Sequence, residues 1–375
     1  MYINRMSLFR NERFEFFIHV PLIWQSAVIS WTLATGIFPY YYKYLSRFVY
    51  WWMGVAATLA LIASVLMRDT IRLLILNRFG TTVTNLTLFL FGGVTESSAN
   101  ADSQKGELFA NLSGPIIYFG MAFFVHCVMI ICQTQKLPLE IIGIVEFVRM
   151  INVALGVINI FPLLVLDGGK IVLLFLSRFF VSFKKAVAFL AEITNVVALL
   201  IMAAGLFVSI KGYFQGGLWW ILIGMYLQEG TALFQRKHQI REILNSETAE
   251  RVMRRDPVSV RSGLSIIDFV QNYLYDFHYK IFPVLGYDLK LQGILLSRKV
   301  FDLSCQQWKE HTVNEIAVSQ LSELTVDINE NILSVLTHMK RTGQSRLVVI
   351  DGEKKPKGTI VLKDILKYLS EKMNL

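Results

Sequence analysis

The chain has 375 residues, of which 54% are hydrophobic and 17% are charged, and its formal net charge is +9. With a mean hydropathy of +0.48, this composition disfavours a soluble globular protein. Positive residues kept on cytoplasmic loops explain the charge better than nucleic acid does, so no nucleic acid partner is predicted. The three cysteines, Cys127, Cys132 and Cys305, have no paired spacing and predict neither a disulfide framework nor a thiolate metal site.

Apolar stretches crowd into the first 230 or so residues. A transmembrane helix needs about 20 predominantly apolar residues. Stretches near or above that length cover residues 16–42, 48–67, 108–135, 141–166, 186–210 and 213–228. They predict a polytopic α-helical membrane protein with about six transmembrane helices, the last two forming a hairpin, in contact with a lipid bilayer.

Lysine and arginine residues are unevenly distributed over the connections between these stretches. They gather before the first stretch, between residues 68 and 105, between residues 178 and 185, and in the tail, whereas the loops at 136 and 211 have one each. Positive residues are retained on the cytoplasmic side of membrane proteins. We therefore expect both termini and the tail to be cytoplasmic, in a membrane of the bacterial cytoplasmic type.

From about Ser246 the sequence becomes rich in charged residues, short β-branched runs and turn signals. An order of strand, helix, strand, strand, helix occurs twice, beginning at Val252 and near Leu324. The tail is therefore predicted to be a soluble α/β pair. The predicted domains are a transmembrane domain at 1–230, a linker at 231–247, and two small domains at 248–312 and 313–375.

Within the membrane part, Arg68-Asp69-Thr70-Ile71-Arg72 is followed by four further motifs in a fixed order. They contain Gly92 and Gly93; Asn111, Gly114 and Pro115; Asn152, Asn159 and Pro162; and Asp167, Gly168 and Gly169. Over roughly residues 48–180 this arrangement resembles the site-2 protease family of intramembrane zinc metalloproteases. Arg68 to Arg72 lie where that family has His-Glu-x-x-His, and Val165 replaces a proline that is common there.

The resemblance implies a metal site whose ligands have been replaced. In the family, two histidines and a later aspartate hold zinc, and the glutamate acts as general base. Here Arg68 and Arg72 take the histidine positions, Asp69 the base position and Asp167 that of the third ligand. Because a guanidinium group has no lone pair and stays protonated, we expect neither bound metal nor catalysis.

We expect instead that Arg68 and Arg72, which share a helix face at a spacing of four residues, converge on Asp167 with Asp69 nearby. Two simpler interpretations stay open. Arg68 would extend from a helix end towards the membrane surface, or Asp167 would be an exposed helix cap.

The tail resembles a tandem pair of cystathionine-beta-synthase (CBS) domains. Met253 to Pro257, Phe282-Pro283-Val284 and Gly293-Ile294-Leu295 carry the likeness in the first copy; Arg346 to Asp351 and Gly358 to Val361 carry it in the second. The resemblance implies dimerisation, and an adenine nucleotide site in some members. Of the nucleotide-contacting positions only Asp364 is kept.

The leading hypothesis is a catalytically inactive site-2 protease homologue. It would act as a scaffold or regulator that binds transmembrane client proteins or a partner protease, with the CBS pair as a sensing and homodimerising module. One alternative is an active zinc intramembrane protease with unusual ligands. Another is a transporter regulated by the CBS pair.

Overall fold

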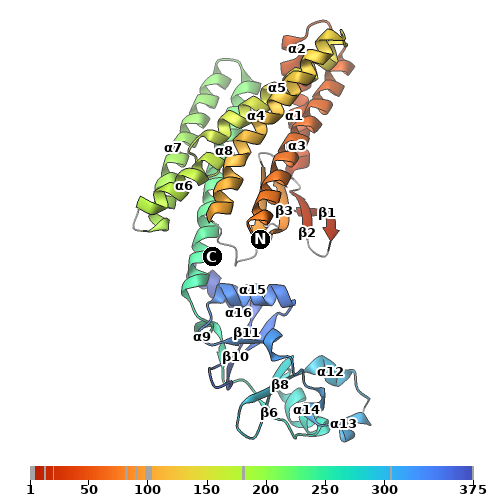
Figure 1. Ribbon diagram of the computed structural model, residues 1–375, viewed down its shortest axis with the longest axis vertical. Helices are drawn as coiled ribbons and strands as arrows, with labels where there is room; N and C mark the ends of the chain where they lie inside the picture. Colours follow the sequence, from red (N-terminus) through yellow and green to blue (C-terminus); the bar gives the residue numbers. More distant parts are fainter. Residues whose placement is uncertain are drawn as a thin grey trace. The chain divides into compact units, whose positions relative to one another are not determined.

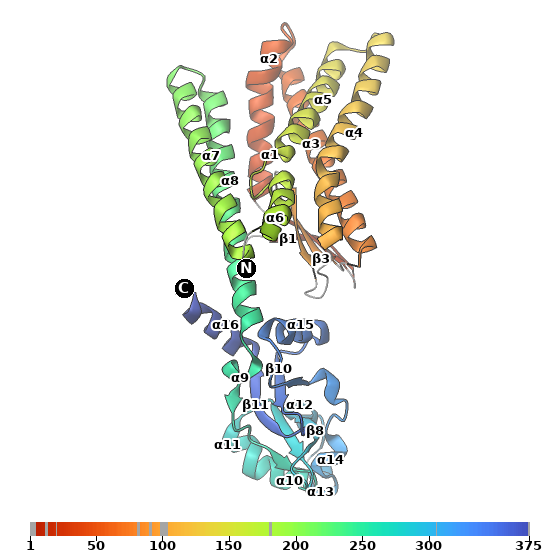
Figure 2. The ribbon, with the colours of Figure 1, turned by 60° about the vertical axis from the view of Figure 1, so that its left-hand side comes forward.

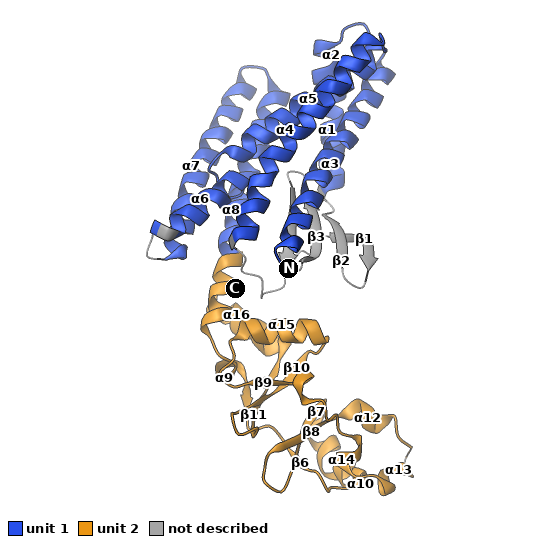
Figure 3. Ribbon diagram, in the orientation of Figure 1, with its two compact units in different colours: residues 1–236 blue, residues 237–375 orange. Residues whose placement is uncertain are grey.

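The computed structural model describes residues 5–11, 14–19, 21–80, 83–89, 92–97, 104–179, 182–304 and 306–373. The chain divides into two compact units, residues 1–236 and residues 237–375 (Figure 3). The division falls within helix α8, Phe214–Ser246. The finer boundaries expected near 230, 247 and 312 stay predictions.

The first unit is a helical bundle with a small sheet (Figure 1). Its helices are α1 (Pro21–Thr32), a π-helical turn η1 (Leu33–Ile37), α2 (Phe38–Tyr41), α3 (Arg47–Arg78), α4 (Gln104–Thr134), α5 (Leu139–Ile160), α6 (Asp167–Phe179), α7 (Phe183–Ile210) and α8. Its strands are β1 (Arg5–Asn11), β2 (Phe14–His19), β3 (Val83–Phe89) and β4 (Gly92–Ser97), in spatial order β1-β2-β3-β4.

Four of the described helices, α3, α4, α5 and α7, are long and apolar enough to cross a membrane. This confirms a polytopic membrane protein. The stretches 16–42 and 213–228 were also expected to span the bilayer, and for the helices within them the assignment stays a prediction.

The first expected span begins too early. Phe14–His19 form strand β2, which pairs in parallel with β3 through Phe16 opposite Leu86 and Ile18 opposite Leu88. Helix α1 begins only at Pro21, a residue whose fixed φ suits the first position of a helix. An apolar run alone does not distinguish a strand from a helix, and the strand's partner lies about 70 residues away.

The fourth expected span ends too late. Helix α5 stops at Ile160, and Phe161 takes an extended conformation with φ −60° and ψ 140°. Pro162 follows, and a residue before proline is driven out of the helical region. A short loop then leads to α6, a helix that was not predicted as a separate element.

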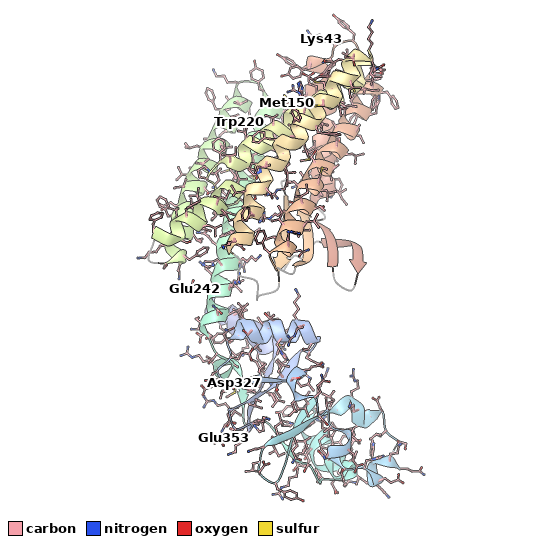
Figure 4. All side chains as sticks on the ribbon, in the orientation of Figure 1. Lys43, Met150, Trp220, Glu242, Asp327 and Glu353 are labelled. Atoms are coloured by element: carbon pink, nitrogen blue, oxygen red, sulfur yellow. The ribbon has the colours of Figure 1, made fainter. Side chains whose placement is uncertain are left out.

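Helices α7 and α8 form the expected hairpin and lie side by side (Figure 2). Gly212 in the turn has φ +97°, a conformation that glycine adopts without strain. A Cβ atom added to Gly205 would lie 2.7 Å from the Gly217 carbonyl oxygen and 2.8 Å from Cβ of Trp220, which is labelled in Figure 4. Small residues thus allow the two backbones to approach closely, a feature also found in pairs of membrane helices.

The second unit contains two sheets of the same design. Strand β10 (Arg346–Ile350) pairs in parallel with β9 (Thr325–Asp327) and antiparallel with β11 (Pro356–Val361), which also pairs with β5 (Arg254–Arg255). In the other sheet β7 (Ile281–Leu285) pairs in parallel with β6 (Val260–Arg261) and antiparallel with β8 (Leu291–Leu296).

Short helices flank the two sheets. They are α9 (Ala249–Val252), α10 (Ile266–Phe269), a π-helical turn η2 (Val270–Leu274), α11 (Tyr275–Phe277), α12 (Ser297–Phe301), α13 (Gln307–Glu310), α14 (Val313–Ile316), a 3₁₀ turn η3 (Leu321–Glu323), α15 (Ile332–Thr342) and α16 (Leu362–Lys372). The repeated pattern of one parallel and one antiparallel pairing confirms the expected α/β repeat.

Candidate functional site: a buried ion cluster

The residues of the Arg68 to Arg72 motif lie in one helix. The Ser46 side chain accepts a hydrogen bond from the Val49 amide and so caps the start of α3. The helix then runs without a break to Arg78. Because residues four apart share a helix face, Arg68 and Arg72 point the same way.

Asp167 is the first residue of α6, and the loop that precedes it is fixed by hydrogen bonds. The Leu164 amide donates to Thr194 Oγ1 of α7 at 2.9 Å, and the Thr194 hydroxyl donates to the Leu190 carbonyl oxygen at 2.7 Å. The two glycines that follow Asp167 permit a very close backbone approach. An added Cβ would lie 2.2 Å from the Ile160 carbonyl oxygen at Gly168, and 1.9 Å from that of Leu163 at Gly169.

Asp167 meets the arginines in the interior of the bundle. Both oxygens accept, Oδ2 from Arg68 Nη2 and Oδ1 from Arg72 Nη1, the latter at 3.2 Å. Arg68 Nη1 also donates to Asp69 Oδ1 at 2.6 Å. The Asp167 side chain is only 1% exposed and that of Arg68 only 5%. The structure therefore brings Arg68, Asp69, Arg72 and Asp167 into one buried ion cluster.

Lys170 is a fifth member that sequence reasoning missed. Its Nζ lies 3.7 Å from Asp167 Oδ1. The spacing of three residues places both side chains on one face of α6, and this was the signal available in the sequence. The cluster thus joins three cationic side chains to two carboxylates.

The glycine of the Asn-Leu-Ser-Gly-Pro motif leaves room for this cluster. A Cβ atom added to Gly114 of α4 would lie 2.0 Å from Asp167 Oδ2 and 3.3 Å from Arg68 Nη2. Pro115 follows within the same helix, and the Asn111 side chain is buried. Any larger residue at position 114 would therefore displace the Asp167 carboxylate.

The remaining motif residues of the bundle lie outside the ion cluster. Asn152 Nδ2 donates to Ser64 Oγ at 3.1 Å and to the Val148 carbonyl oxygen at 2.8 Å, joining α5 to α3. Asn159 Nδ2 donates to the Leu155 carbonyl oxygen, and Pro162 lies in the loop after α5. Gly92 and Gly93 lie in β4, opposite Phe89 and Leu88 of β3.

The cluster does not suit a zinc ion. Zinc sites in proteins use thiolate, imidazole or carboxylate ligands, whereas two of the groups facing Asp167 are guanidinium groups without a free lone pair. Both Asp167 oxygens already accept from arginine. Among the residues that the structure describes, no group of three or more His, Cys, Asp or Glu side chains is arranged to hold a metal.

In the tail, Asp364 lies in the first turn of α16 and is also bound by an arginine. Arg254 Nε donates to Asp364 Oδ2 at 2.9 Å, and Arg254 Nη2 to Oδ1 at 2.7 Å. The two parallel hydrogen bonds form a bidentate pair. A nucleotide that used Asp364 would have to displace Arg254.

Comparison with known proteins finds similar proteins for both parts of the chain. The profile of Peptidase family M50 matches residues 126–205, which include Asp167 but not α3, and the CBS domain profile matches residues 314–371. "Putative zinc metalloprotease Rip3" of Mycobacterium tuberculosis is 26% identical, over 89% of this chain and 86% of its own length. "Putative zinc metalloprotease sll0528" of Synechocystis is also 26% identical, over 91% of each chain.

Among solved structures, the site-2 protease from Methanocaldococcus jannaschii aligns with 61% of this chain and 94% of its own, at 19% identity and a TM-score of 0.45. The CBS domain of a bacterial CNNM/CorC family Mg²⁺ transporter, in complex with ATP, aligns with 35% of this chain and 92% of its own. That alignment has 18% identity and a TM-score of 0.32.

Proposed function

We propose that this chain is a catalytically inactive homologue of the site-2 proteases. It combines a site-2 protease (Peptidase family M50) domain with a C-terminal CBS domain pair. In the inactive role it binds transmembrane helices of client proteins or of a partner protease and does not cleave them. The CBS pair is its sensing and homodimerising module. The distribution of lysine and arginine supports a cytoplasmic location for both termini and for the tail.

This proposal depends on one observation, which is that two arginine side chains bind the Asp167 carboxylate. The carboxylate at the third-ligand position is neutralised by Arg68 and Arg72, whose spacing is that of the family's two histidines. Metal-assisted hydrolysis needs a bound water that the metal activates. With guanidinium groups in two ligand positions, Asp69 has no such water to deprotonate.

The cost of leaving a buried charge unpaired favours keeping the arginines beside Asp167. A charged group at membrane depth is costly unless it is paired, and removing one partner of a buried ion pair costs about 3 to 5 kcal/mol. The arginines therefore replace the positive charge of a metal ion as counter-charge for Asp167. The helical framework around the site is kept while its chemistry changes.

The test is to restore the missing ligands. The protein is purified in detergent and offered zinc, and bound metal is measured by mass spectrometry together with cleavage of a transmembrane reporter. We expect no stoichiometric zinc and no cleavage in the parent. The triple variant Arg68→His, Asp69→Glu, Arg72→His supplies two imidazoles beside Asp167 and is expected to bind about one zinc ion per chain.

Two controls sharpen this test. Adding Asp167→Ala to the triple variant removes the third ligand and is expected to abolish zinc binding. Lowering the pH through the imidazole range should release the metal from the triple variant, because protonated histidine does not coordinate. Equal zinc content in the parent and the triple variant would contradict the proposal.

A second candidate function is that of an active zinc intramembrane protease with unusual ligands. The curated relatives favour it, because they are named "putative zinc metalloprotease". Stoichiometric zinc in the parent, together with reporter cleavage that a chelator stops, would establish this function in place of the first. Cleavage without metal would contradict both.

A further inference from the structure

One face of α7 carries polar side chains inside a membrane-length helix. Glu192 and Asn195, one turn apart, are both exposed, and neither forms a hydrogen bond or ion pair with any residue that the structure describes. Glu192 lies nine residues after Phe183, the first residue of α7, so it stands about 14 Å along the helix. An ionisable residue inside a membrane span is costly and by default marks a functional site.

A shallow, open hollow lies on the surface of α7 beside this carboxyl group. Its volume is about 260 Å³, and it is lined by Phe189, Glu192, Ile193, Val196 and Val197. Phe189 is 47% exposed and Val196 is 55% exposed. The face therefore offers a shallow apolar surface with a carboxyl group and an amide, which is a combination suited to contact with another helix.

We propose that this α7 face, defined as Phe189, Glu192, Asn195 and Val196, binds a transmembrane helix of another protein that places a lysine or arginine beside Glu192. The apolar side chains would pack against the partner helix, while its cation would pair with the carboxylate away from lipid. This inference rests on the proposed function in one respect, because it assigns the surface that holds a client helix.

Charge complementarity disfavours a second copy of this chain as the occupant. In the described membrane-length helices, the basic side chains at mid-helix already have partners. Arg68 and Arg72 bind Asp167, and Arg149 lies 3.9 Å from Glu146. The other lysines and arginines of these helices lie at or just beyond their ends.

An exposed histidine on α4 does not supply the cation either. His126 lies eight residues before the end of α4, whereas Glu192 lies nine residues after the start of α7. Figure 1 shows α4 and α7 running in the same direction. In a second copy with the same orientation, His126 would therefore lie at a different depth from Glu192.

The test measures binding of designed peptides to the full-length protein in proteoliposomes. The probes are polyleucine transmembrane peptides of about 21 residues. Two of them carry a single lysine or a single glutamate at the depth of Glu192, and the third keeps leucine at that position. Energy transfer from a donor on the tail to an acceptor on the peptide reports binding. We expect the lysine peptide to bind about tenfold more tightly than the leucine peptide, and the glutamate peptide to show no such gain.

Variants of the α7 face locate the interaction. Glu192→Gln keeps the size and removes the charge, and is expected to abolish the preference for lysine. Asn195→Leu is expected to weaken binding of the lysine peptide by a smaller factor. His126→Leu, which removes another exposed polar group from a membrane helix, is the matched control and is expected to change nothing.

Three outcomes overturn this inference. The first is equal binding of the lysine and leucine peptides, and the second is a lysine preference that survives Glu192→Gln. The third is energy transfer between two differently labelled copies of the chain that Glu192→Gln abolishes, which would make a second copy the occupant. Because the assay needs no turnover, zinc binding and cleavage by the parent would refute the inactive role without touching this result.

Discussion

The chain contains the same chemical pair, arginine with aspartate, in two very different surroundings. In the bundle, the Arg68 side chain is 5% exposed and that of Asp167 is 1% exposed. In the tail, the Arg254 side chain is 63% exposed and that of Asp364 is 17% exposed. The tail pair has the better bidentate geometry, yet water and salt screen it. We therefore expect burial, more than hydrogen-bond geometry, to decide how much the free energy of unfolding depends on such a pair.

The largest expected effect comes from removing the shared carboxylate in the bundle. Asp167→Asn keeps the shape of the side chain but leaves Arg68, Arg72 and Lys170 with one acidic partner fewer. Leaving buried charges without their counterion should destabilise the bundle by about 3 to 5 kcal/mol. Unfolding in detergent, followed by circular dichroism, measures it. A loss no larger than that of Asp364→Asn in the tail would show that burial does not decide the effect.

A smaller effect is expected from crowding the buried cluster without changing its charge. Gly114→Ala adds a methyl group where Asp167 Oδ2 now lies, and we expect a loss of about 1 to 3 kcal/mol, as for overpacking in other cores. Gly120→Ala, on the same helix, is the matched control because an added Cβ there meets nothing within 4 Å. The two variants should differ clearly in unfolding midpoint, and similar midpoints would show that the cluster has room to adjust.

Breaking the exposed pair of Arg254 and Asp364 should lower the stability even less. Arg254→Ala is expected to destabilise the tail by about 0 to 1 kcal/mol, and the loss should shrink further in high salt because the Debye length falls. Hydrogen exchange of α16 at two salt concentrations measures both effects. A loss of several kcal/mol that persists in high salt would mean that the pair acts like the buried one.

The smallest effect concerns Asp351, a carboxylate held by backbone amides in an exposed turn. Its Oδ1 accepts from the amides of Glu353 and Lys355, and Lys357 Nζ lies 3.3 Å from Oδ2. The Lys355 amide, followed by the Lys357 ammonium, lowers the pKa of Asp351 below its ordinary value. The ionised Asp351 side chain therefore contributes its full stabilisation above the ordinary aspartate pKa of about 3.9. That stabilisation is lost as the pH falls through the lowered pKa.

Asp351→Asn tests that sign, since an amide oxygen still accepts from the backbone but no longer titrates. As the pH falls below about 5, through the range in which aspartates titrate, the tail of the variant should lose less stability than the tail of the parent. Thermal unfolding at several pH values measures it. Parallel curves for the parent and the variant would exclude Asp351 as a contributor.

The parts of the site whose geometry depends on local spacing could be predicted from the sequence. The separation of four residues between Arg68 and Arg72 fixed their common direction, and the structure brings both to Asp167. Lys170 was missed although its spacing from Asp167 obeys the same rule. Glu192 was missed because averaging hydropathy over a long helix conceals one charged residue among many apolar ones.

Features that depend on distant partners were harder to predict. Strand β2 owes its conformation to pairing with β3, which no local pattern at Phe14–His19 specifies. The loop after α5 did have a local signal, because Pro162 restrains the residue before it, but the continuing apolar run obscured it. The Arg254 pairing with Asp364 joins residues 110 positions apart and was not visible in either segment alone.

The double contact that Arg68 makes, to Asp69 and to Asp167, has a consequence for single substitutions in the ion cluster. A single substitution of either arginine by histidine removes a buried counterion but leaves the other guanidinium facing the site, so no metal is gained in exchange. Each single step towards a zinc ligand set is therefore expected to pass through a less stable variant. Under the proposed inactive role, selection for stability alone would therefore keep both arginines in place.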